Sequence, residues 1–461
     1  MATIDRVLQR IDDGLEDSLS RLFDLLRIRS ISTDPAFAGD CRNAAEWLAG
    51  ELSGIGIPSE VRNTTGHPMV VGHAANGQAG PHALFYGHYD VQPVDPLDLW
   101  DADPFDPRIV TRDDGSRMIV ARGACDDKGQ LMTFVEAARA WMAENGALPL
   151  PISVLIEGEE ESGSPSLEAF LTDNREELSV DFALICDTGM WDRNTPAITT
   201  MLRGMVSEEI VITAADKDLH SGLFGGAARN PNRVLARIIA DLHDADGRIM
   251  VPGFYDGVAE MPADITAMWS ELGFDEKAFL GGVGLSEPAG EAGRSVLEQI
   301  WTRPTCDVNG MSGGYTGEGF KTVIPSQASA KISFRLVGEQ DPVAIRDSFR
   351  DFVSARVPAD CAVAFTGFGC NPAVQLPMDS DTLRKGRAAL TDEWGRPAAI
   401  IGIGGSIPIA GDFKTMLGMD SLMIGFGLDD DQIHSPNEKY DLQSFHKGIR
   451  SWARVLDQLA R

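Results

Sequence analysis

The chain has 461 residues, of which 43% are hydrophobic and 24% charged, a composition typical of a soluble globular protein with more than one domain. Its 40 basic and 69 acidic residues give a formal net charge of −29, which argues against nucleic acid or an anionic membrane as a partner. No apolar run approaches the ~20 residues of a membrane span, and the acidic N-terminal stretch lacks the layout of a signal peptide, so we expect a cytoplasmic protein.

The first part of the chain predicts alternating helices and strands. Apolar residues recur at helical spacing over 4–27, and "CRNAAEWLAGEL" predicts a second helix. Strands are then predicted at 82–91, 151–156 and 181–187, and helices at 129–145 and 166–174. Because these strands are apolar throughout, they predict a mostly parallel sheet covered by helices on both faces.

The pattern changes after about residue 203. Residues 205–215 and 328–338 alternate like half-exposed strands, and 230–245 predicts an amphipathic helix. Strands with one open face and a few helices predict a smaller α+β domain.

The α/β pattern returns near residue 373, with a predicted strand in "SLMIGFG" and a closing helix in "LQSFHKGIRSWARVLDQL". We therefore predict one α/β domain in two parts, 1–203 and 373–461. The smaller α+β domain, 204–372, is then an insertion into it.

Histidines and carboxylates follow the predicted strands at their ends. The motifs are "GHYDVQP", "RGACDDKG", "EGEEESGS", "ICDT" and "IHSPNEK", which contain His88, Asp90, Asp126, Asp127, Glu159, Glu160, Glu161, Asp187 and His434. Ligand sites gather at the carboxyl ends of strands in open α/β sheets, so these side chains are expected to lie together. Two like charges ~4 Å apart repel by about 4 kcal/mol at an effective dielectric of ~20, so such a cluster needs counter-charge.

A pair of divalent metal ions would supply that counter-charge. Imidazole and carboxylate ligands without thiolate suit zinc, or alternatively manganese or cobalt. The six cysteines are widely scattered with no CxxC pair, which indicates neither a thiolate site nor a disulfide framework. Two zinc ions together contribute about four positive charges. Three carboxylate ligands and one hydroxide neutralise these charges if both histidines are neutral.

Each of these residues taken alone has an ordinary structural interpretation. His88 could be a hydrogen-bonded core histidine, Asp127 a helix-start residue and Asp187 a turn residue. The glutamate run could be solvated, and His434 could lie on the surface. These separate explanations do not account for the fact that all of the residues are predicted to lie at strand ends of one sheet. Their joint occurrence there favours a metal site over the separate structural roles.

With "PAITTMLRG" and "DLHSGLFGG", these motifs resemble the co-catalytic zinc metallopeptidases, a family that includes carnosinase and related dipeptidases, glutamate carboxypeptidase, acetylornithine deacetylase and succinyl-diaminopimelate desuccinylase. The motifs occur in the family's order over nearly the whole chain. Residue by residue, the motifs are most similar to those of the carnosinase-like dipeptidases. The resemblance implies a catalytic α/β domain and an inserted domain that serves as lid and dimerisation surface.

The resemblance also implies the metal ligands. His88, Asp126 and Asp187 would bind one zinc ion. Asp126, Glu161 and His434 would bind the other, so that Asp126 bridges the pair.

Further roles in the catalytic domain follow from the same resemblance. Glu160 would be the general base that activates water and later protonates the leaving amine. Asp90 would orient His88, and a strained cis peptide would join Asp126 to Asp127. Glu159 lies outside the family pattern and receives no role.

His220 in "DLHSG" matches a family histidine that reaches into the neighbouring subunit's site and stabilises the oxyanion. On the residues alone, a turn histidine before Ser-Gly is the better interpretation. The resemblance reverses that preference and implies a homodimer.

The resemblance also implies four substrate contacts. Arg335 would grip the substrate's terminal carboxylate, and Asn309, Thr322 and Ser406 match positions near the substrate. Two positions depart from carnosinase-like enzymes, which commonly have an acidic residue at Ile403 and a histidine at Phe368. Both changes make the pocket more apolar, so we hypothesise a substrate whose N-terminal side is blocked, distant or apolar.

In this family, aspartate at the position of Asp187 accompanies dipeptidases and aminopeptidases, whereas glutamate accompanies deacylases and carboxypeptidases. The leading hypothesis is therefore a dipeptidase or short-peptide hydrolase that releases a C-terminal amino acid. The alternatives are an N-acyl-amino-acid amidohydrolase and a catalytically inactive binding protein on the same fold, against which the presence of Glu160 argues.

Overall fold

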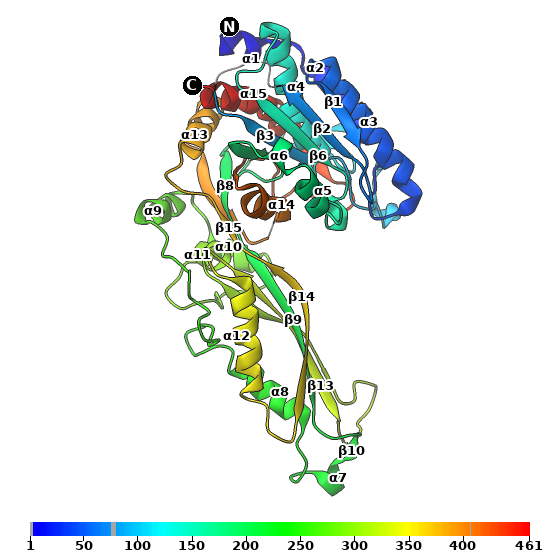
Figure 1. Ribbon diagram of the computed structural model, residues 1–461, viewed down its shortest axis with the longest axis vertical. Coiled ribbons are helices and arrows are strands. Elements are labelled where there is room, and N and C mark those ends of the chain that lie inside the picture. Colours follow the sequence, from blue (N-terminus) through cyan, green and yellow to red (C-terminus); the bar gives the residue numbers. More distant parts are fainter. Residues whose placement is uncertain (1–2, 75–79, 406) are drawn as a thin grey trace. The chain divides into compact units, whose positions relative to one another are not determined.

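The computed structural model describes residues 3–74, 80–405 and 407–461 (Figure 1). The chain divides into two compact units. The first consists of residues 1–200, 376–401 and 412–461, and the second of residues 201–375 and 402–411. In the described part of the chain, every helix is too short or too polar to cross a bilayer.

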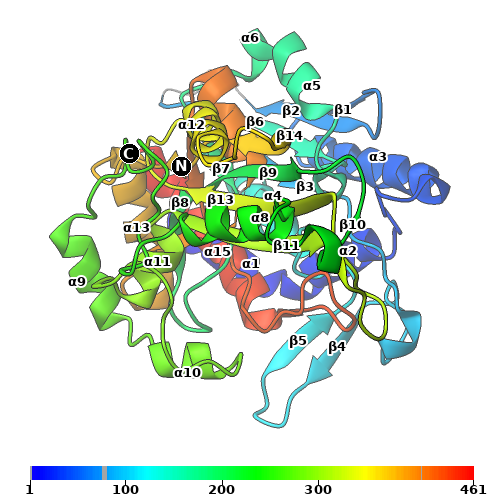
Figure 2. The same ribbon diagram turned by 90° about the horizontal axis from the view of Figure 1, so that it is seen from below.

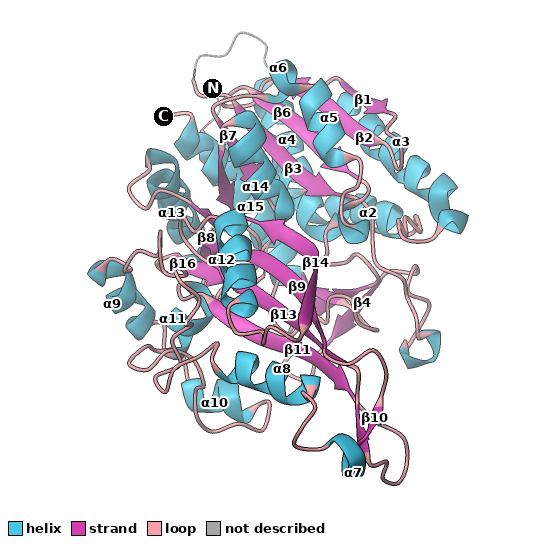
Figure 3. Cartoon of the chain, turned by 60° about the horizontal axis from the view of Figure 1, so that its bottom comes forward, coloured by secondary structure: helices cyan, strands magenta, loops and turns pink. Residues whose placement is uncertain are grey.

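A nine-stranded sheet contains the main strands of the first unit, and its last strand, residues 374–375, belongs to the second unit (Figure 3). Its order is β1 (Ser59–Arg62), β2 (Met69–Ala74), β6 (Ile152–Glu157), β3 (Ala83–His88), β7 (Phe182–Ile185), β17 (Asp420–Met423), β8 (Ala197–Leu202) and β15 (Val374–Gln375), with β16 (Ala399–Ile403) paired to β8. The central strands β6, β3, β7 and β17 are parallel, as predicted. The pairs β1–β2, β2–β6, β17–β8 and β8–β15 are antiparallel.

Helices cover both faces of this sheet, as adjacent residues of β3 demonstrate. Phe85 stacks on Phe134 of α4 (Lys128–Asn145) with ring centroids 3.6 Å apart, and its edge contacts Trp452 of α15 (Leu442–Leu459). Tyr86 contacts Phe413, which begins a one-turn helix over Phe413–Leu417. Because successive strand side chains point to opposite faces, these contacts lie on opposite sides of the sheet. The predicted two-sided covering is confirmed.

The predicted helix over 4–27 is wrong in one respect, because it is two helices. They are α1 (Ile4–Asp13) and α2 (Leu15–Leu26), and they are separated by Gly14. Glycine is costly to order in a helix interior, so the chain turns there. The other helices of the first unit are α3 (Ala38–Gly54), α5 (Leu167–Asp173), α6 (Arg175–Leu178) and α13 (Asp381–Trp394). The helix α14 (Pro408–Asp412) belongs to the second unit except for its last residue.

A small three-stranded sheet of β4 (Arg108–Thr111), β5 (Arg117–Val120) and β18 (Lys439–Asp441) also belongs to the first unit. Its β18 pairs antiparallel with β5. The sheet therefore ties the segment just after His434 to the segment just before Asp126, which lie more than 300 positions apart in the chain.

The second unit contains a four-stranded antiparallel sheet in the order β11 (Thr305–Gly313), β13 (Gln327–Leu336), β9 (Gly204–Thr213) and β14 (Ala362–Asn371) (Figure 2). The helices α8 (Pro231–Ala240) and α12 (Pro342–Ser354) contact its strands. Residues of β9 alternate strictly between buried and half-buried, and Ile210 and Phe334 lie in the core that Leu235 and Phe349 close. The alternation seen in the sequence thus marks the helix-covered face.

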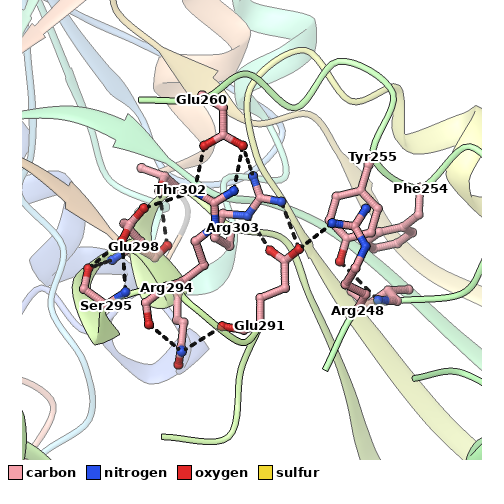
Figure 4. A network of polar contacts seen from close by, with 12 residues as sticks. Arg248, Phe254, Tyr255, Glu260, Glu291, Arg294, Ser295, Glu298, Thr302 and Arg303 are labelled. Atoms are coloured by element: carbon pink, nitrogen blue, oxygen red, sulfur yellow. Dashed lines mark hydrogen bonds and ion pairs between the residues drawn. The ribbon is translucent and has the colours of Figure 1, made fainter. Parts of the chain in front are cut away.

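Shorter elements complete the second unit: β10 (Leu219–His220), β12 (Val323–Ile324), α7 (Ser221–Phe224), α9 (Ala263–Glu271), α10 (Glu276–Gly281) and α11 (Val296–Trp301). A network of ion pairs holds the segment around α11 (Figure 4). Arg303 pairs with Glu291, and both side chains are buried. Arg294 makes two bonds of 2.6 Å to Glu260, and Arg248 bonds to Glu291 at 3.1 Å.

Candidate metal centre

The parallel strands β6, β3 and β7 end at the same edge of the large sheet, and several of the predicted site residues lie at or just after these ends. The prediction that all of the site residues follow strands of this sheet is wrong for Asp126, which follows β5 of the small sheet, and His434 lies just before β18 of that same small sheet. His88 is the last residue of β3, and Asp187 lies two residues beyond β7. Glu160 and Glu161 lie in a single turn of 3₁₀ helix after β6. This is the arrangement expected of a ligand site in an open α/β sheet.

One group of possible metal ligands is formed by His88, Asp126 and Asp187. His88 Nε2 lies 3.1 Å from Asp126 Oδ1 and 3.9 Å from Asp187 Oδ2. This nitrogen is fully buried yet makes no hydrogen bond in the described chain. A buried imidazole nitrogen without a hydrogen bond, facing two carboxylates, is what a metal ligand requires.

A second group is formed by Asp126, Glu161 and His434. His434 Nε2 lies 3.0 Å from Asp126 Oδ2 and 3.1 Å from Glu161 Oε2. Asp126 therefore turns one carboxylate oxygen toward each histidine. The peptide bond from Asp126 to Asp127 is cis, as the resemblance implied.

The cluster is strongly electronegative. Burial raises the pKa of Asp187 to about 8. Hydrogen bonds with Asp126 and Glu161 raise the pKa of His434 to about 10. Burial acts to lower the pKa of His88, but the carboxylates of Asp126 and Asp90 raise it well above its ordinary value. The site thus draws positive charge to itself, and its donor set of imidazoles and carboxylates fits divalent cations.

Asp90 joins the two halves of the site. It is fully buried, and its carboxylate accepts backbone N–H groups of Glu160 at 3.3 Å and Glu161 at 3.0 Å. Its Oδ1 also lies 3.3 Å from His88 Nδ1. An anion beside Nδ1 favours the tautomer that carries its proton there and leaves Nε2 free as a ligand.

The family model of Peptidase family M20/M25/M40 matches residues 84–458, which is most of the chain and includes both groups of possible ligands. The chain belongs to this peptidase family. The family resemblance that the motifs indicated is thereby confirmed.

Relatives of this M20/M25/M40 peptidase match over nearly their whole length. This chain is 28% identical over 473 residues to the Cys-Gly metallodipeptidase dug1 of Schizosaccharomyces pombe, and the match covers 99% of this chain and 98% of the relative. It is 29% identical over 479 residues to the Beta-Ala-His dipeptidase of Homo sapiens, covering 100% and 93%. Among solved structures, the M20 family metallo-carboxypeptidase Sso-CP2 from Sulfolobus solfataricus matches with a TM-score of 0.79 and 29% identity, covering 96% of this chain and 99% of that one.

Glu438 of this M20/M25/M40 peptidase was missed by the sequence analysis, although "IHSPNEK" contains it. Its buried carboxylate accepts a hydrogen bond from Arg122 at 2.7 Å and from the backbone N–H groups of Gly123, Cys125 and Asp126 at 2.9 to 3.0 Å. Glu438 thereby fixes the backbone that presents Asp126. The only sequence signal was an acidic residue four positions after His434, and nothing in the sequence shows which loop it contacts.

We expect Glu438→Gln to weaken metal binding by roughly 10- to 100-fold, the usual effect of losing a group that orients a ligand. The glutamine amide would place N–H groups against backbone N–H donors and so disturb the loop around Asp126. Apparent metal dissociation constants from competition with a chelator measure this effect, with the exposed Glu176→Gln as matched control. Equal affinities in the two variants would show that Glu438 does not position the ligand.

Glu159, which received no role from the sequence, also shapes the site. Its buried carboxylate accepts the backbone N–H of His67 at 2.9 Å and of Ser166 at 3.1 Å. A Cβ atom at Gly66 would lie 1.6 Å from Glu159 Oε1, so a side chain there would displace the carboxylate. Glu159 thus anchors the turn from which Glu160 and Glu161 project.

The predicted substrate residues that the structure describes belong to the second unit. His220 and Thr322 are exposed near the β10–β12 pair, in which His220 lies opposite Val323. Asn309 lies at the bulge of β11, and Arg335 lies on β13. Ser406 lies outside the described residues.

Proposed function

We propose that this M20/M25/M40 peptidase hydrolyses the amide bond of a dipeptide or short peptide and releases a C-terminal amino acid. Family membership and the similarity to a Cys-Gly metallodipeptidase and a Beta-Ala-His dipeptidase support a metal-dependent dipeptidase. The observation that carries the proposal is Asp126, whose two oxygens each face a different histidine–carboxylate group. That sharing suits a dinuclear site, with zinc as the first candidate metal and manganese or cobalt as the others.

In this proposal, His88, Asp126 and Asp187 hold one ion, and Asp126, Glu161 and His434 hold the other. When bound, the two ions supply Lewis acidity that polarises the scissile carbonyl and acidifies the attacking water. Glu160 accepts the proton of that water and transfers it to the leaving amine. Its backbone is already fixed by Asp90, and burial raises the pKa of its carboxyl, which suits a group that must both take and return a proton.

We assign oxyanion stabilisation to His220, contributed by the partner in a homodimer. His220 Nδ1 accepts the backbone N–H of Gly222 at 3.0 Å. A neutral imidazole that accepts at Nδ1 carries its proton on Nε2, so Nε2 is the donor. The side chain is exposed in the single chain, which leaves this donor available.

His220→Ala is expected to retain its metal content and lose most turnover, by about 10²- to 10³-fold in kcat, the usual cost of removing an oxyanion donor. Metal analysis and steady-state kinetics on the same preparation measure both quantities. Mixing His220→Ala with Glu160→Gln should restore some activity if the histidine acts across subunits, because one site of each mixed dimer would then be intact. Turnover near that of the wild type would refute the role of His220.

Arg335, Asn309, Thr322 and Ser406 remain the proposed substrate contacts. Ile403 ends β16, and Phe368 lies in β14 with 61% of its surface exposed. Neither side chain offers a carboxylate or another hydrogen-bond acceptor to a substrate ammonium, so we propose that the preferred substrate has a blocked, distant or apolar N-terminal side.

A substrate panel tests the proposed function. Dipeptides and the N-acetyl derivatives of the same C-terminal amino acids are incubated with metal-loaded protein, and release of the amino acid is measured. We expect higher kcat/KM for dipeptides, above all for those whose N-terminal side is blocked, distant or apolar. Preferential cleavage of the N-acetyl compounds would identify a deacylase instead, and inertness toward both classes would contradict peptide hydrolysis.

A further inference from the structure

Arg203, which links β8 to β9, fastens a glycine-rich loop of the second unit. Its Nε donates a hydrogen bond to the carbonyl of Gly404 at 3.1 Å, and its backbone N–H donates to the carbonyl of Gly405 at 3.2 Å. Neither of these two bonds involves the outer nitrogens of the guanidinium. The side chain is therefore fixed in direction while part of its donor capacity stays open.

The open donor is a buried one. Arg203 Nη1 is shielded from solvent and has no hydrogen-bond partner in the described chain. A buried N–H group without an acceptor is unfavourable, and native structures rarely leave one without a reason. An acceptor that belongs to a ligand would supply that reason.

A second guanidinium accompanies it. Arg335 lies on β13 opposite Met205 of β9, two residues from Arg203 along the chain. Burial, and then the positive charge of Arg335, lower the pKa of Arg203 to about 10. Neither arginine forms an ion pair with a carboxylate of the described residues, although acidic residues outnumber basic ones by 69 to 40. Asp307 offers some compensating negative charge to Arg203 but forms no ion pair with it.

The surroundings hold Arg203 closely. A Cβ atom at Gly404 would lie 2.9 Å from Arg203 Nη2, and one at Gly402 would lie 2.7 Å from Cβ of Trp301. The loop thus lies between Arg203 and α11, which Trp301 ends. The ion-pair network of Arg294 and Arg303 flanks that helix on both sides in the chain (Figure 4).

We propose that Arg203 and Arg335 together form a two-guanidinium site for one carboxylate, the C-terminal carboxylate of the substrate. The inference rests on the proposed peptidase function and adds Arg203 as a second cation beside Arg335. A guanidinium presents paired N–H donors that match a carboxylate, and two of them hold it more selectively than one. The site would recognise peptides with a free C-terminus and reject the corresponding amides.

The test compares Ala-Ala with Ala-Ala amide as substrates of the metal-loaded wild type, Arg203→Gln and Arg203→Lys. Arg233→Gln is the matched control, because Arg233 is an exposed arginine on α8 in the same unit. We expect the ratio of kcat/KM for acid over amide to fall about 10- to 100-fold in Arg203→Gln, the loss of one charge-assisted interaction. Arg203→Lys keeps the positive charge but loses the paired N–H donors of the guanidinium. Its ratio of kcat/KM for acid over amide should lie between those of the wild type and Arg203→Gln.

Binding of free alanine and of alaninamide, measured by isothermal titration calorimetry, gives a second readout that needs no turnover. We expect alanine to bind more weakly to Arg203→Gln than to Arg233→Gln, with alaninamide unchanged. Should the wild type cleave neither dipeptide, the proposed function fails, but calorimetry still decides on the site. Equal losses for acid and amide would show that Arg203 only holds the glycine loop, and would overturn the inference, as would an unchanged affinity for alanine.

Discussion

Glu160→Gln is expected to lower kcat by about 10²- to 10⁴-fold, the contribution typical of general acid–base catalysis, while metal content stays at the wild-type level. Glutamine has nearly the same size as glutamate but accepts no proton from water. Glu160 belongs to neither group of possible ligands, and Asp90 holds its backbone rather than its side chain. The substitution therefore removes the base without disturbing the ligands.

Steady-state kinetics, with metal content measured on the same sample, separates these quantities. Glu168→Gln is the matched control, since Glu168 is an exposed glutamate on the helix that follows. If Glu160→Gln kept its turnover, another group would have to be the base. If it lost its metal, Glu160 would be a ligand, and the division of roles within the glutamate run would be wrong.

Asp126→Asn is expected to weaken the binding of both metal ions by more than about 100-fold, since even groups that only orient a ligand contribute 10- to 100-fold. Asp126 is the one residue that both groups share. Loss of its negative charge removes one anionic ligand from each group at once. Activity should fall with metal content, and partial recovery is expected at high metal concentration.

Substitution of an unshared ligand provides the comparison. Asp187→Asn should weaken the binding of one metal ion and leave the binding of the other nearly unchanged. Substitution of the exposed Asp173 by Asn should affect the binding of neither ion. A metal titration monitored by calorimetry shows whether the affinity of one metal site or of both has fallen. If Asp126→Asn, like Asp187→Asn, weakened the binding of only one metal ion, Asp126 would not be a ligand shared by both ions.

Regular elements were predictable where the residue pattern reports local geometry. The helix over 442–459 and the apolar strand near 152 appear at the expected positions, because burial on one or both faces leaves a direct trace in the sequence. The break at Gly14 was missed because apolar residues continue at helical spacing on both sides of it.

Most residues of the candidate site were predictable as a group because they follow parallel strands of one sheet, whereas Asp126 follows β5 of the small three-stranded sheet. What the sequence could not supply was the partner of each side chain. Glu438 and Glu159 bond to backbone groups far away in the chain, and any backbone N–H looks the same in a sequence. Nothing in the sequence distinguishes Arg203 either, because its buried Nη1, which has no acceptor among the described residues, is a feature of the folded chain alone.

Anomalous X-ray scattering at the zinc edge, from crystals of zinc-loaded wild-type protein, tests the central claim most directly. We expect two peaks in the first unit, one contacted by His88, Asp126 and Asp187 and the other by Asp126, Glu161 and His434. A single peak, or peaks at which Asp126 does not contact both ions, would contradict the dinuclear site and the mechanism built on it.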